Sequence, residues 1–162
     1  MFNLEMFIPY RLYQATENAS QAFRAVYAEL YGLSRAEWRV LFNVAQYGPM
    51  SAQEIVQRTY LDKTRISRAV QKLIECKWLK RKSDPADRRR QTLELAARGR
   101  TVVDELSMLA ERHNEKIIEI VGAEKAQELL AVLEQIEAAA FEFDADDARR
   151  QRREIQRSRR AS

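Results

Sequence analysis

Two helix-start signals near the centre of the chain constrain its fold more than any other feature. Each is a capping box, in which a serine side chain accepts from the backbone amide three residues on while a glutamate reaches back to the serine amide. The two boxes are Ser34 with Glu37 and Ser51 with Glu54. Gly48 ends the first helix before the second begins. This part of the chain is therefore predicted to form two separate helices in succession.

A third helix is predicted after a short connection. Asp62 is a good N-cap for it, and Ile66, Val70 and Leu73 form its apolar stripe. Two short helices about four residues apart, the second beginning with polar and basic side chains, are typical of a helix-turn-helix. In that motif the second helix enters the major groove of DNA, and its first residues meet base edges. The candidate DNA contacts are Lys63, Thr64, Arg65, Ser67 and Arg68.

Positive charge is concentrated in the same region. Residues 58–90 contain 12 basic and 4 acidic side chains, whereas residues 91–143 contain 5 and 11, and the whole chain has a net charge of +4. A basic segment on an otherwise acidic body is expected of a protein that binds a polyanion. A charge run alone, or any one of these residues, is equally well explained as solvated surface. DNA binding is inferred from their combination with the two capping boxes.

The segment after the third helix predicts a β-hairpin. The runs "WLKRKS" and "RQTLEL" alternate as strands do, and "DPAD" between them supplies a turn. Such a hairpin would form a wing beside the recognition helix. At its tip Arg88, Arg89 and Arg90 would contact phosphates or the narrow minor groove, and Asp87 would hold an arginine in place.

Long amphipathic helices are predicted on both sides of this region. Apolar or small residues recur at helical spacing in residues 12–30, after Gly99, and in "AQELLAVLEQIEAAAFEF". These helices carry more apolar surface than a small winged-helix lobe can cover. A homodimer is the economical explanation, with half-sites roughly 34 Å apart on DNA; a different protein partner is the alternative.

The predicted fold class is mainly α with a small β wing, a winged helix-turn-helix with N- and C-terminal dimerisation helices. We divide the chain into an N-terminal dimerisation helix (1–33), a DNA-binding domain (34–96), C-terminal dimerisation helices (97–143) and a basic tail (144–162). The tail has seven arginines in its last 14 residues. It is either a flexible arm that contacts phosphates or a helix that pairs acidic with basic residues.

Composition argues against several other classes of protein. No apolar run approaches the roughly 18 residues of a membrane span, and the N-terminus lacks the basic start of a signal peptide, so a cytoplasmic location is expected. One cysteine and one histidine leave no Cys/His zinc site, and there is no glycine-rich phosphate loop. We therefore expect no metal, no cofactor and no enzymatic activity.

Residues 33–100 resemble the winged-helix core of MarR-type transcriptional regulators, a family named for multiple antibiotic resistance. The most specific element is "DPADRRRQTLEL", which is similar to the family's wing motif and places its aspartate and arginine at Asp87 and Arg89. In architecture the resemblance extends over roughly residues 8–143. It implies an obligate homodimer on a palindromic operator and a small-molecule site between the DNA-binding and dimerisation regions. A repressor relieved by its ligand is expected rather than an activator.

Two positions depart from the family's usual pattern. Lys77 stands where glycine is usual, so the recognition helix must end with a left-handed non-glycine residue or end differently. Leu95 is followed by Ala96 and Ala97 instead of a threonine that caps the next helix. Neither departure alters the proposed DNA contacts.

The resemblance also implies a ligand, and aromatic effectors are common in the family. Arg11 or Arg39 would suit a carboxylate, whereas Trp38 and His113 are as readily explained as core residues. The stretches "PYRL" and "EWRVL" are similar to the same segments of regulators found near genes for aromatic-acid catabolism. This similarity favours an aromatic acid or its coenzyme A thioester as the ligand. The candidate ligand residues are Tyr10, Arg11, Trp38, Arg39 and His113.

Two alternative functions stay open. A redox-sensing branch of the family uses a reactive cysteine near its N-terminus, whereas Cys76 here ends the recognition helix, where a buried and inert thiol is the competing explanation. The second alternative is a non-enzymatic helical protein-interaction module that keeps the winged-helix shape.

Overall fold

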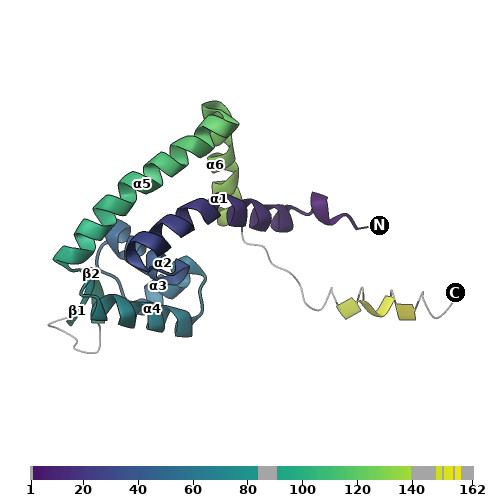
Figure 1. Cartoon of the computed structure of the whole chain (residues 1–162). Coiled ribbons are helices and arrows are strands. Elements are labelled where there is room, and N and C mark those ends of the chain that lie inside the picture. The colour runs from purple at the N-terminus through teal and green to yellow at the C-terminus, as the bar shows by residue number, and fades with distance from the viewer. Residues whose placement is uncertain (1, 84–90, 140–148, 151, 155, 158–162) are drawn as a thin grey trace. The chain divides into compact units, whose positions relative to one another are not determined.

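A computed structural model describes residues 2–83, 91–139, 149–150, 152–154 and 156–157. The chain separates into two compact units, Met1–Ile117 and Ile118–Ser162. The elements in chain order are the 3-10 helix η1 (Leu4–Met6), α1 (Ile8–Tyr31), α2 (Arg35–Tyr47), α3 (Ala52–Thr59), α4 (Lys63–Glu75), β1 (Leu79–Ser83), β2 (Gln91–Leu95), α5 (Ala97–Val121) and α6 (Ala123–Ala138) (Figure 1). The predicted fold class, mainly helical with a small β wing, is confirmed.

Both predicted capping boxes are formed. The Ser34 amide donates to the Glu37 carboxylate at 2.8 Å, and the Glu37 amide donates back to the Ser34 hydroxyl at 3.3 Å. Ser51 and Glu54 repeat the arrangement at the start of α3. The backbone hydrogen bond that Ser51 donates is the main cause that lowers the pKa of Glu54. These boxes fix where α2 and α3 begin and hence the short connections of the helix-turn-helix.

The two strands form an antiparallel hairpin, here called the wing. Its register runs from the pair Leu79 and Leu95 to the pair Ser83 and Gln91. An isolated antiparallel bridge joins Met50 to Leu93, so the residue before the α3 capping box also pairs with the wing. The predicted turn, with Asp87, Arg88, Arg89 and Arg90, lies outside the described residues.

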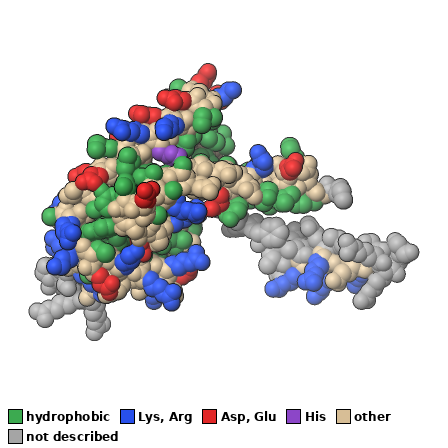
Figure 2. Space-filling model, viewed as in Figure 1, with side chains coloured by type: hydrophobic (Ala, Val, Ile, Leu, Met, Phe, Trp, Pro, Cys, Tyr) green, Lys and Arg blue, Asp and Glu red, His purple; other side chains and the backbone are tan. Residues whose placement is uncertain are grey.

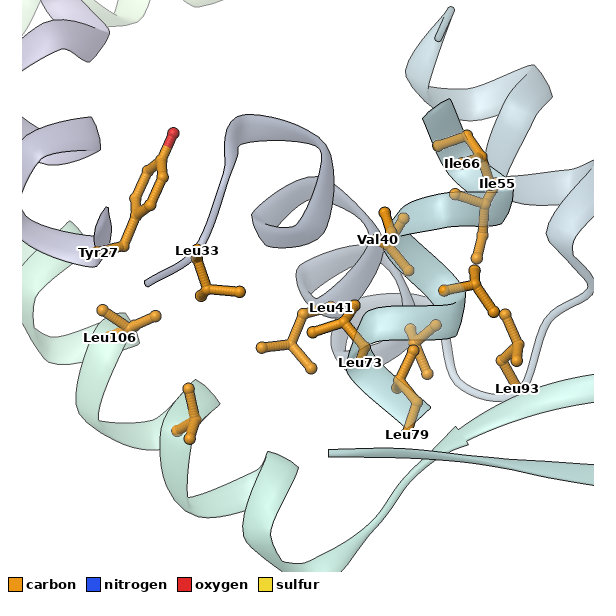
Figure 3. Packing of buried hydrophobic residues seen from close by; sticks show 14 of the residues in the cluster. Tyr27, Leu33, Val40, Leu41, Ile55, Ile66, Leu73, Leu79, Leu93 and Leu106 are labelled. Atoms are coloured by element: carbon orange, nitrogen blue, oxygen red, sulfur yellow. The ribbon is translucent and has the colours of Figure 1, made fainter. Parts of the chain in front are cut away.

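A single apolar core holds α1 to α5 together within the first unit (Figure 3). The stripe predicted for α4 is buried, with Ile66 and Leu73 each only 1% exposed. The largest fully buried side chains come from five elements and are Val40, Leu41, Ile55, Ile66, Leu73, Leu79 and Leu106. Burial of these groups fixes α4 against α2 and α3, and it fixes the wing against the end of α4.

α4 ends in a left-handed turn made by Lys77. Its φ is 61°, the Lys77 amide donates to the Ile74 carbonyl, and the Trp78 amide donates to the Leu73 carbonyl, each at 2.9 Å. This is a Schellman motif, in which glycine is usual because a Cβ is unfavourable there. Of the two terminations anticipated for this site, the left-handed non-glycine residue is the one observed.

The start of α5 lacks a side-chain cap, as the sequence suggested. Ala96 offers no side-chain oxygen, but its amide donates to the Trp78 carbonyl at 2.9 Å. Gly99 faces the same carbonyl so closely that an added Cβ would lie 2.0 Å from the Trp78 oxygen. Backbone contact between α5 and the start of the wing therefore replaces the missing cap.

In the second unit, α6 buries none of its residues. Leu129, Leu130 and Val132 are 47%, 61% and 48% exposed. Among the helices described, none is long and apolar enough to cross a membrane.

Candidate nucleic-acid interface

α4 presents a polar and basic face to solvent. Its apolar residues Ile66, Ala69, Val70 and Leu73 pack inward against α2 and α3. Because these positions recur at helical spacing, the opposite face is left free. All five predicted contacts on this helix are exposed: Lys63, Thr64, Arg65, Ser67 and Arg68. Figure 2 shows Lys and Arg side chains along the edge that α4 and β1 occupy in Figure 1.

The first turn of α4 is held by Asp62. Its carboxylate accepts from the Arg65 amide at 2.8 Å, and its other oxygen lies 3.1 Å from Nε of the Arg65 side chain. Both side chains are more than half exposed, so this ion pair is weak in water. Arg65 can therefore leave Asp62 without a large loss of free energy.

A second charged contact fixes α4 to α2. The Nζ of Lys72 donates to the Glu37 carboxylate at 2.9 Å and to the Gly32 carbonyl at 2.8 Å. Glu37 is 8% exposed. A nearly buried carboxylate held by both a capping box and an ammonium group orients the recognition helix on the lobe.

Arg81 also lies beside the recognition helix. A cavity of about 440 Å³ lies between α3, α4 and β1, with Lys63, Ser67 and Arg81 among its polar lining residues and Val56, Ile66 and Val70 among its apolar ones. Arg81 was not among the DNA contacts predicted from the sequence. Side chains alternate between the two faces of a strand, so in the run "LKRKS" Arg81 lies on the opposite face from Lys80 and Lys82. This alternation is the sequence signal that could have identified Arg81.

Those two lysines stabilise the base of the wing. Lys80 and Lys82 lie 3.3 and 3.0 Å from the Glu94 carboxylate on the neighbouring strand. The hydrogen bond from Lys82 is the largest cause that lowers the pKa of Glu94, and Lys80 adds to it. Glu94 thus offsets the charge of these two lysines, whereas Arg81 donates to the Gln91 side chain at 3.3 Å.

Two of the predicted ligand residues, Trp38 and His113, share one aromatic cluster around Phe23. Phe23 stacks on His113 and meets Trp38 edge to face, each with ring centroids 5.8 Å apart. A ring nitrogen of the half-buried His113 lies 2.7 Å from the Ala19 carbonyl, so this side chain has a hydrogen-bond partner. The Trp38 Nε1 is buried and has no hydrogen-bond partner within the described part of the chain.

The other ligand candidates have separate surroundings. The Arg39 guanidinium donates to the Thr59 carbonyl at the end of α3, at 3.3 Å. The Tyr10 hydroxyl accepts from Gln14 at 2.8 Å, and Arg11 is exposed beside it on α1. The structure therefore joins Trp38 to His113 and leaves a common ligand site for all five residues as a prediction.

Cys76 is the C-cap of α4 and is half-buried. Among the residues that the structure describes, no group of three or more His, Cys, Asp or Glu side chains is placed to hold a metal ion. In the tail, residues 149–150, 152–154 and 156–157 are helical, and all the arginines among them are exposed.

The helix pair α3–α4, supported by α2 and flanked by the wing, defines a winged helix-turn-helix protein. Residues 31–90 match the MarR family model. The predicted resemblance to MarR-type transcriptional regulators is thus confirmed over this core. None of the curated proteins matches the chain.

Solved structures with the same fold cover most of the chain. A MarR/EmrR family transcriptional regulator from Acinetobacter sp. ADP1 is 20% identical, with a TM-score of 0.75 over 84% of this chain and 96% of the other. BpsR of Bordetella bronchiseptica, whose DNA binding is regulated by 6-hydroxynicotinic acid, is 21% identical, with a TM-score of 0.75 over 86% and 99%. PcaV of Streptomyces coelicolor, solved with its natural ligand, is 20% identical, with a TM-score of 0.68 over 87% and 99%.

Proposed function

We propose that the protein is a sequence-specific DNA-binding transcriptional regulator. The observation that carries this proposal is the exposed face of α4, where basic and hydroxyl side chains lie on a helix fixed by a buried apolar stripe. Arg and Lys match the acceptors of guanine and the phosphates, and Thr and Ser hydroxyls reach either. Arg81 extends the basic surface from α4 to the wing, and Arg88, Arg89 and Arg90 at the wing tip, with Asp87 in support, are proposed to continue it.

The proposed unit of DNA binding is a homodimer on a palindromic operator. Large apolar side chains are exposed before and within the first helix, with Phe2, Met6 and Ile8 73%, 76% and 63% exposed. The second unit exposes its own apolar residues on α6. Surfaces of this kind mark an interface with another chain. A dimer would also place two recognition helices on consecutive turns of one DNA face.

The proposed mode of action is repression in the cytoplasm, relieved by a small ligand. BpsR responds to 6-hydroxynicotinic acid, an aromatic acid, which supports the same class of ligand for this protein. The candidate effectors are aromatic acids and their coenzyme A thioesters. Tyr10, Arg11, Trp38, Arg39 and His113 stay the candidate ligand residues.

Substitution of α4 residues tests DNA binding directly. Arg68→Ala and Lys63→Ala are expected to lower affinity for an operator fragment, and removal of one phosphate-binding cation should reduce the slope of log affinity against log salt by about one. Arg24→Ala is the matched control, because Arg24 is exposed on α1 outside the helix-turn-helix. An equal effect of all three substitutions would reject α4 as the recognition helix.

The redox and protein-interaction alternatives have distinct tests. Cys76 lies at the end of α4 opposite to the proposed base contacts, so its oxidation would act through the turn that follows. DNA affinity that stays constant after peroxide treatment rejects the redox alternative. Failure to bind any genomic fragment favours the interaction module.

A further inference from the structure

Tyr60 forms the turn between α3 and α4 in an unfavourable backbone conformation. Its φ and ψ are 54° and 22°, in the left-handed region, and its amide donates to the Val56 carbonyl at 3.1 Å to cap α3. A residue with a Cβ is less stable in this conformation than glycine, and an aromatic side chain brings the backbone no compensating hydrogen bond. The turn itself therefore does not explain why tyrosine occupies this position.

Packing does not explain it either. The side chain of Tyr60 is 93% exposed, more than any other exposed large hydrophobic residue described. Within the described chain, no hydrogen bond or ring contact involves this side chain, whereas the ring of Tyr47 holds the Arg58 guanidinium 3.5 Å from its centroid. A strained and solvent-exposed aromatic residue is typical of a site whose stabilising partner is another molecule.

The position of Tyr60 identifies the partner by its chemistry. Tyr60 comes two residues before Asp62, the N-cap of α4, and three before Lys63, the first proposed DNA contact. A side chain just before a helix that enters the major groove lies at the edge of the groove, where the phosphate backbone runs. A phenol is a neutral hydrogen-bond donor at pH 7 and is among the side chains that contact DNA phosphates.

We propose that the hydroxyl of Tyr60 donates a hydrogen bond to a DNA phosphate at the edge of the groove that α4 enters. This inference rests on the proposed function and adds a contact that charge patterning does not reveal. Because the phenol is uncharged, the contact adds affinity without releasing a counterion. It therefore differs from a lysine or arginine contact in its salt dependence.

The test measures DNA affinity of the full-length protein over a range of salt concentrations. The probes are a duplex selected from a random pool by the wild-type protein and a random-sequence duplex of equal length. Tyr60→Phe, which removes only the hydroxyl, is expected to weaken binding to both duplexes by on the order of tenfold. The salt slope is expected to stay unchanged.

Two further variants separate the contact from a structural effect. Tyr60→Gly should weaken DNA binding as Tyr60→Phe does but raise the thermal midpoint, because glycine adopts the left-handed turn without strain. Tyr13→Phe, which removes a hydroxyl from a residue of α1 that is 61% exposed, should leave DNA affinity unchanged.

The remaining outcomes overturn the inference in distinguishable ways. If the wild type binds DNA and Tyr60→Phe binds it equally tightly, the phosphate contact is rejected and the proposed function is left intact. Weaker binding to the selected duplex alone indicates a base contact and also rejects it. If the wild-type protein selects no duplex from the pool and does not bind the random-sequence duplex, the proposed function and this inference are refuted together.

Discussion

Lys72 of α4 donates a hydrogen bond to Glu37 of α2 at 2.9 Å, across 35 positions of sequence. Glu37 belongs to the capping box that starts α2, so one carboxylate both begins the scaffold helix and holds the recognition helix. The orientation of the proposed DNA-reading surface is thus linked to the start of the preceding helix.

Removal of the ammonium group should destabilise the fold. Lys72→Met leaves the nearly buried Glu37 carboxylate without its cation, and a cost of about 1–2 kcal/mol in the free energy of unfolding is expected. Chemical denaturation measures it. Gln71→Ala is the control, because Gln71 is exposed and its side chain donates to Glu75 one turn along the same helix. An unchanged unfolding free energy in Lys72→Met would contradict a stabilising role for the pair.

The end of α4 offers a stabilising substitution. Lys77→Gly should raise the free energy of unfolding by about 0.5–1 kcal/mol, because relief of the left-handed strain exceeds the extra backbone entropy that glycine loses on folding. Lys77→Ala keeps the Cβ and should give no such gain. Equal thermal midpoints for the two variants would show that the turn is unstrained.

The close approach of α5 to the backbone of Trp78 predicts a destabilising substitution. The Cβ of Gly99→Ala would collide with the backbone oxygen of Trp78, which cannot rotate away as a side chain can. A loss of about 1–3 kcal/mol is expected in thermal or chemical unfolding. Arg98→Ala, a change at the neighbouring exposed residue, serves as the control. A Gly99→Ala variant as stable as that control would show that α5 can shift away.

The pairing of Glu94 predicts a pH dependence. Since Lys82 and then Lys80 lower the pKa of this carboxyl in the folded state, its contribution to stability is complete above the ordinary carboxyl pKa and disappears as the pH falls through the lowered value. Glu94→Gln should therefore reduce the thermal midpoint at pH 7. Its difference from the wild type should shrink as the pH approaches about 2. A difference that is constant with pH would contradict the pairing.

Local signals in the sequence predicted most of the fold. The capping boxes at Ser34 and Ser51 and the N-cap Asp62 placed three helix starts, because caps depend on residues only three positions apart. Strand alternation placed the hairpin. The left-handed turn at Lys77 was one of two expected endings for α4.

Long-range contacts could not be predicted in the same way. The pair of Lys72 with Glu37 and the stacking of His113 on Phe23 join residues far apart in sequence, and they exist only once the helices have packed. The left-handed conformation of Tyr60 could not be predicted from its residue type either, since tyrosine does not favour such a turn. This conformation follows from the spacing of α3 and α4.

DNA binding by the purified protein is the most direct test of the proposed function. We would measure fluorescence anisotropy with DNA from immediately upstream of its own gene and with a shuffled duplex, at several salt concentrations. The proposed function predicts tight, preferential binding to the upstream DNA that weakens steeply with salt and is impaired by Arg68→Ala. Equally weak binding to both duplexes, repeated with other genomic fragments, would contradict it.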